Sequence, residues 1–83
     1  MERTTRVGRN GRIEATGEYA EACAAAARFV EERRMPGQSF HLALNSLVYY
    51  EGTDPYSCEL GRRFGLAAAD VDHIRLAGGY GTV

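Results

Sequence analysis

The chain has 83 residues, of which 45% are hydrophobic and 25% charged, and its formal net charge is −1 at neutral pH. These values are ordinary for one folded domain, here expected to span residues 1–83, and they exclude a uniformly basic protein built to bind polyanions over its whole surface. No apolar run is long enough to cross a bilayer, so no membrane partner is expected. A core this small is marginal, and a second subunit would add to it, which favours a homodimer.

Charge is distributed unevenly along the chain. Residues 1–12 contain four arginines and one acid, whereas the remaining residues contain six arginines and ten acids. The chain therefore begins with a basic arm that precedes an acidic body.

Residues 4–16 are predicted to form a β-hairpin. Asn10-Gly11 is a strong turn signal, because a two-residue primed turn requires positive φ at both central positions. The β-branched residues Val7 and Ile13 flank the turn and favour strands. An isolated hairpin is only marginally stable in water, so this one must pack on the helices or pair with a second copy.

The hairpin carries Arg6, Arg9 and Arg12 near its turn. These side chains could clamp DNA phosphates, or they could simply protect a strand edge from aggregation. Residues 4–15 resemble the N-termini of swapped-hairpin regulators and antitoxins, with Gly11-Arg12-Ile13 as the matching core. The resemblance implies that two subunits interleave their hairpins. The proline-containing segment of that family is replaced here by residues 17–19.

Two helices are predicted next. Residues 18–34 place apolar side chains at helical spacing and are followed by Pro36-Gly37, which ends the helix. Alanines 24–27 would let another helix approach closely. Ser39 is the expected N-cap of a second helix over residues 39–51, whose apolar residues lie on most of its circumference and suggest a central position.

Residues 55–76 are predicted to form a pair of short helices. Asp54 and Pro55 suit the start of the first helix. Gly65 supplies the positive φ that a tight corner between helices requires, and Gly61 lets the two backbones come close. We therefore expect a mainly α protein with an N-terminal β-hairpin, a small domain of three to four helices that contains a helix-turn-helix-like unit.

Residues 57–76 resemble the helix-turn-helix superfamily, with Gly61, Gly65 and five apolar residues at its spacing: Leu60, Phe64, Leu66, Val71 and Ile74. In that family the second helix enters the major groove and its first residues contact base edges. Transferred by position, those residues are Ala67, Ala68, Ala69, Asp72 and His73. Arg62 and Arg63 would lie near the DNA backbone.

The second helix of this pair has features that oppose DNA binding. Its first turns lack the Arg, Lys, Asn and Gln side chains that read bases best, and Asp70 and Asp72 would face a polyanion. These two acids could instead contact a basic protein partner. Residues 77–83 form a glycine-rich tail, expected to be flexible or strand-like, in which Tyr80 is available to a partner.

No pattern for an enzyme, a metal centre or a cofactor is found in the sequence. Cys23, Cys58, His41 and His73 could supply four zinc ligands, but they contain no closely spaced pair. We therefore expect a non-enzymatic cytoplasmic protein with reduced cysteines. Two functions remain open: a DNA-binding regulator or antitoxin-like protein that uses Arg6, Arg9, Arg12, Arg62, Arg63, Ala68 and His73, and a protein-interaction module on a degenerate helix-turn-helix that uses Asp70, Asp72 and Tyr80.

Overall fold

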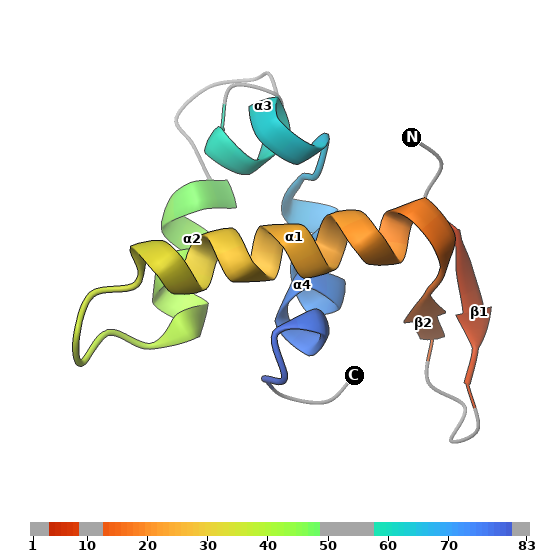
Figure 1. The fold of residues 1–83 in the computed structure, drawn as a ribbon, viewed down its shortest axis with the longest axis horizontal. Helices are drawn as coiled ribbons and strands as arrows, with labels where there is room; N and C mark the ends of the chain where they lie inside the picture. The colour runs from red at the N-terminus through yellow and green to blue at the C-terminus, as the bar shows by residue number, and fades with distance from the viewer. Residues whose placement is uncertain (1–3, 9–12, 49–57, 81–83) are drawn as a thin grey trace.

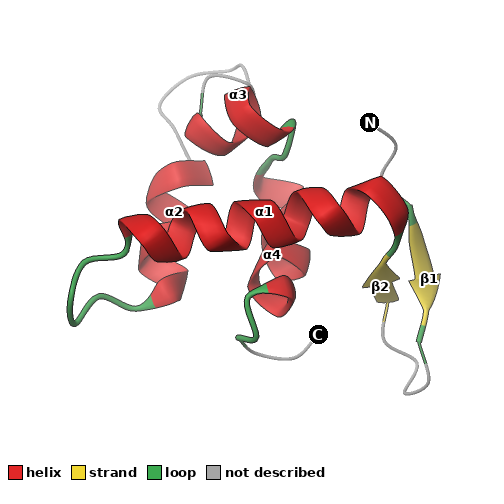
Figure 2. Ribbon diagram, in the orientation of Figure 1, coloured by secondary structure: helices red, strands yellow, loops and turns green. Residues whose placement is uncertain are grey.

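The computed structural model of the chain describes residues 4–8, 13–48 and 58–80. These residues form a small two-stranded sheet followed by helices, so the predicted fold class is confirmed (Figure 1; Figure 2). The elements are β1 (Thr5–Val7), β2 (Ile13–Ala15), α1 (Gly17–Arg33), α2 (Phe40–Val48), α3 (Glu59–Phe64), a 3₁₀ turn (Ala68–Asp70) and α4 (Val71–Ala77).

The hairpin packs against the helices through β2. Strands β1 and β2 are antiparallel, with Thr5 opposite Ala15 and Val7 opposite Ile13. Because side chains alternate along a strand, these four residues share one face of the hairpin. Ala15 packs against the core, whereas Val7 and Ile13 are 71% and 49% exposed. The outer half of this apolar face therefore extends beyond the helical body, beside the N-terminal end of α1 (Figure 1).

Helix α1 is the central element. It crosses α2 and α4 in Figure 1 and packs against α2, α3, α4 and β2. Ala26 and Ala27 are buried, whereas Ala24 and Ala25 are only partly buried. The described part of α2 packs against α1, α3 and α4, but Leu42 is 60% exposed, so the apolar circumference predicted for residues 39–51 is not buried on every side.

Several helices begin or end close to the residues predicted from the sequence. Thr16 precedes α1, and the helix ends at Arg33, shortly before Pro36-Gly37. Ser39 Oγ accepts a hydrogen bond from the Leu42 N–H at 3.1 Å, so Ser39 caps the start of α2 as predicted. The segment 49–57, with Asp54, Pro55 and the end of the predicted helix 39–51, lies outside the described residues.

The predicted pair over residues 55–76 contains α3, the 3₁₀ turn and α4. Cys58, in extended conformation, is the N-cap of α3, and its Sγ accepts the Gly61 N–H at 3.2 Å, so α3 starts later than Pro55. Gly61 is buried, and Gly65 ends α3 with φ of 68°, as the corner requires. Both α3 and α4 pack on α1 and α2.

Candidate functional site

A buried polar cluster joins the start of α4 to α1. The Tyr19 hydroxyl donates to Asp70 Oδ1 at 2.7 Å, and Asp70 Oδ2 accepts the Ala67 N–H at 2.7 Å. Burial of the Tyr19 side chain, together with its hydrogen bond to Asp70, raises the pKa of Tyr19 well above its ordinary value. The carboxylate of Asp70 therefore serves the fold, by capping the turn before α4 and by anchoring it to α1.

The role predicted for Asp70 as an exposed contact to a partner is wrong. The residue is 1% exposed, because the 3₁₀ turn directs its side chain toward Tyr19. A carboxylate three residues after the N-cap of a helix often accepts a hydrogen bond from the N–H of the N-cap residue. Ala67 and Asp70 have this spacing, so the sequence contained evidence for the cap. Asp72 remains exposed and pairs with Arg75 at 2.7 Å.

His73 lies on the same side of α4 as Asp70. Its Nδ1 is 3.3 Å from the Tyr19 hydroxyl, and its Nε2 is shielded from solvent without a hydrogen-bond partner in the described part of the chain. The predicted contact of His73 with base edges is therefore not supported, because the i, i+3 spacing from Asp70 turns the ring toward α1. The imidazole ring of His73 lines a pocket of about 220 Å³, which is also lined by Cys23 and Leu76.

Two arginines lie over the ring of Phe29 where α3 packs on α1. The guanidinium of Arg33 stands 3.6 Å from the centroid of the Phe29 ring, and that of Arg63 stands 4.8 Å from the same centroid. Arg63 and Arg62 also bond to Glu59, and these bonds hold the pKa of the Glu59 carboxyl below its ordinary value. We call Arg33, Arg62 and Arg63 the arginine cluster. Arg33 was not predicted as a site residue, since no local pattern places it beside Arg62 and Arg63.

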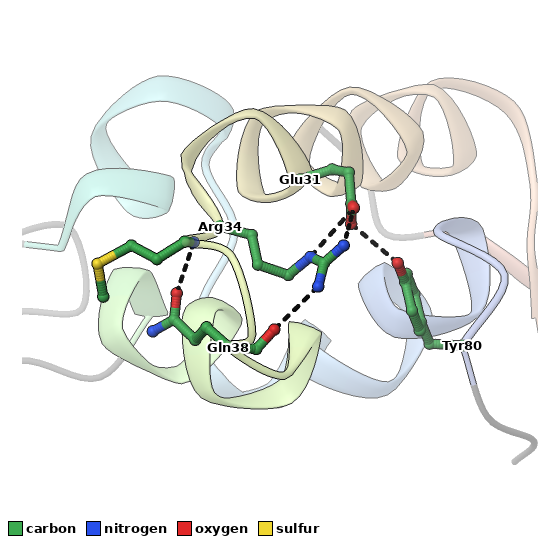
Figure 3. Close-up of polar contacts among 5 residues, drawn as sticks. Glu31, Arg34, Gln38 and Tyr80 are labelled. Atoms are coloured by element: carbon green, nitrogen blue, oxygen red, sulfur yellow. Dashed lines mark hydrogen bonds and ion pairs between the residues drawn. The ribbon is translucent and has the colours of Figure 1, made fainter.

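Tyr80 contacts two helices of its own chain. Its ring stacks on Phe40 at 4.3 Å between centroids, and its hydroxyl donates to Glu31 Oε2 at 2.9 Å (Figure 3). Arg34 donates to the other oxygen of Glu31 and to the Gln38 carbonyl. After α4 the backbone turns back through Gly78 and Gly79, so Tyr80 packs on α1 and α2 instead of lying in a free tail.

The two basic regions lie at opposite ends of α1. Arg6 is on the hairpin and pairs with Glu14 at 3.2 Å, while Arg9, Arg12 and the Asn10-Gly11 turn lie outside the described residues. The 17 residues of α1 correspond to about 25 Å of helix. Ala68, next to the α3–α4 corner, is exposed. The structure thus groups Arg62 and Arg63 with Arg33 and leaves Arg6 at the far end of α1.

Cys23 and Cys58 are buried thiols that form no disulfide bond. Within residues 4–8, 13–48 and 58–80, no three His, Cys, Asp or Glu side chains converge to hold a metal ion. The described helices include none with the length and hydropathy needed to cross a membrane. No protein-family model, curated protein or solved structure matches this chain.

Proposed function

We propose that the protein is a small DNA-binding regulator, of the antitoxin-like kind, that acts as a homodimer. It contacts DNA phosphates through the arginines of the hairpin (Arg6, Arg9 and Arg12) and through Arg62 and Arg63. The α3–α4 unit serves as a helix-turn-helix-like scaffold. This function is non-enzymatic and requires no cofactor.

The burial of Asp70 is the observation that favours this proposal most. A carboxylate facing a polyanion would weaken binding, and the sequence alone placed two of them at the start of the second helix. Asp70 is 1% exposed, and Asp72 is ion-paired with Arg75. Neither carboxylate is therefore left exposed and unpaired where it would contact a DNA phosphate directly.

The proposed binding relies on phosphates more than on bases. Ala68 and Ala69 are exposed at the start of the unit, and their methyl groups can contact thymine but cannot form the hydrogen bonds that distinguish bases. Affinity should then come mainly from counterion release and depend steeply on salt. We expect weak selectivity among sequences.

The deciding experiment measures the affinity of the purified protein for a fluorescent random-sequence duplex over a series of salt concentrations. The affinity should fall linearly with salt on logarithmic axes, and the double variant Arg62→Gln/Arg63→Gln should reduce the slope by about 1.8, or 0.9 per lost phosphate contact. Arg9→Ala/Arg12→Ala tests the hairpin in the same way. Circular dichroism of each variant checks that α3 and the hairpin remain folded. No binding at low salt would overturn the proposal.

A second function is a protein-interaction module. It is favoured by the absence of any base-reading side chain at Ala67–Ala69 and by the exposed apolar residues Val7 and Ile13. The acidic surface predicted for such a module does not include Asp70, because this residue is buried. A partner would therefore contact a mainly apolar surface. Failure to bind DNA, combined with recovery of a specific protein partner, would favour this function.

A further inference from the structure

The large apolar side chains that are exposed in the described chain lie in two places: on the hairpin, and at the end of the molecule where α1 leads into α2. At this second place Met35 is 63% exposed and Leu42 is 60% exposed. A pocket of about 170 Å³ lies there and is lined by Arg33, Met35, Gln38, Ala43, Ser46 and Leu47. We call it the α1–α2 pocket. Leu42 lies beside it, one helical turn before Ser46.

The volume of the α1–α2 pocket indicates what kind of molecule fits it. Pockets for small-molecule ligands measure about 300–1,000 Å³, so this one is too small for such a ligand. A water molecule occupies about 30 Å³ in the liquid, so the pocket has the space of about five or six waters. That is room for one large side chain, which a protein partner would supply.

The loop between α1 and α2 holds the rim of the pocket in place. The N–H of Met35 donates to Gln38 Oε1 at 3.0 Å, and the N–H of Gln38 donates to the Met35 carbonyl at 3.0 Å. The side chain of Arg34 donates to the Gln38 carbonyl at 2.9 Å (Figure 3). These bonds fix the loop before a partner binds, so binding costs less conformational entropy.

Arg33 gives the pocket a charged edge. Its side chain is exposed, and its guanidinium stacks on the Phe29 ring, 3.6 Å from the centroid. Among residues 4–8, 13–48 and 58–80, no carboxylate forms an ion pair with Arg33, whereas Arg34 is paired with Glu31. Stacking limits the motion of the guanidinium and leaves its N–H groups available at the ring edge. The charge that complements this edge is a carboxylate.

We propose that the α1–α2 pocket, together with Leu42, is a docking site for a protein segment that inserts one large apolar side chain and places a carboxylate against Arg33. Methionine and arginine, both present here, are enriched in protein interfaces. The site includes neither the hairpin nor Arg62 and Arg63. The inference therefore goes beyond the proposed function, and its test requires no DNA.

The test titrates the protein with a capped, alanine-rich helical peptide that carries one leucine and one glutamate four positions apart. Two matched peptides replace the glutamate by glutamine or the leucine by alanine. Binding is followed by the amide signals of the protein in NMR spectra, which should shift at Ser46 and Leu47. The glutamine peptide should bind about two- to fivefold more weakly, as expected for an exposed ion pair, and the alanine peptide about tenfold more weakly.

Protein variants test the role of each part of the site. Arg33→Gln should remove the preference for glutamate over glutamine, because the ion pair is then absent with both peptides. Arg33→Lys keeps the charge and should keep the preference. Leu42→Gln should weaken the binding of both peptides. Arg28→Gln removes an exposed arginine of the same helix that does not line the pocket, and should change nothing. Circular dichroism checks that each variant is folded.

Three results would overturn the proposal. One is the absence of binding at millimolar peptide, or amide shifts that occur away from Ser46 and Leu47. Another is a preference for glutamate that persists in Arg33→Gln. The third is a shift of the same amide signals when the protein alone is concentrated, since the occupant of the pocket would then be a second copy of the chain.

Discussion

One carboxylate, Asp70, links local and tertiary structure at the start of α4. Its Oδ2 accepts a backbone N–H three residues earlier, which is a local cap, and its Oδ1 accepts the hydroxyl of Tyr19, 51 positions away. The same side chain thereby sets where α4 begins and where α4 lies on α1. Burying such a group is favourable only when its hydrogen bonds are formed, and losing one is therefore costly.

We predict that Tyr19→Phe lowers the free energy of unfolding at neutral pH by about 1.5–3 kcal/mol, the range for a hydrogen bond to a charged group. The ring and its burial are kept, so the change isolates the hydroxyl. Urea denaturation followed by circular dichroism measures it. Tyr80→Phe is the matched control: it removes a hydroxyl from a hydrogen bond at the surface, with Glu31, and should cost less.

Alkaline pH provides the check on this explanation. The pKa of Tyr19 is raised above its ordinary value of 10.0 in the folded protein, so above pH 10 the unfolded chain loses this proton while the folded protein keeps it. Ionisation therefore favours the unfolded state, and the stability advantage of the native protein over Tyr19→Phe should shrink as the pH rises above 10. An advantage that stays constant at alkaline pH would contradict the buried hydrogen bond.

At the scale of elements, the corner between α3 and α4 depends on the backbone of Gly65. Its φ is 68°, and a Cβ built there would meet nothing within 4 Å. A substitution is therefore penalised by backbone conformation alone, without a clash. We predict that Gly65→Ala destabilises the protein by about 1 kcal/mol, measured by urea denaturation.

Gly65→Asn is the informative companion to Gly65→Ala. Asparagine tolerates the left-handed region better than alanine, so it should recover part of the lost stability although its side chain is larger. If asparagine is worse than alanine, crowding rather than backbone conformation limits this position.

Elements with local signals were predictable from the sequence. The alanine-rich periodicity of α1, the cap at Ser39 and the corner at Gly65 each depend on residues within a few positions of one another. The contacts of Tyr80 within the chain could not be predicted for the opposite reason: its partners Glu31 and Phe40 lie 49 and 40 positions away, and a glycine-rich tail resembles a flexible end. Arg33 was missed because only the packing of α3 on α1 brings it beside Arg63.

At the scale of the whole molecule, the hairpin stands apart from the helical body. Val7 and Ile13 form a register pair and are 71% and 49% exposed on one face, although a two-stranded hairpin is marginal without further packing. On the other face, Arg6 forms an ion pair with Glu14 at 3.2 Å. Because a two-fold interface brings the same surface of both subunits together, two copies of the hairpin can bury this apolar face against each other.

We predict that the dimer in the proposed function forms through this apolar face of the hairpin. Val7→Thr/Ile13→Thr keeps the β-branched residues that favour strands but removes much of the apolar surface, so it should shift the protein toward the monomer. Light scattering after size-exclusion chromatography, over a range of protein concentrations, measures the mass. Leu42→Gln is the control, because Leu42 is similarly exposed, at 60%, but lies on α2. If the native protein is a monomer at every concentration, or if the double variant stays dimeric, the hairpin does not form the interface.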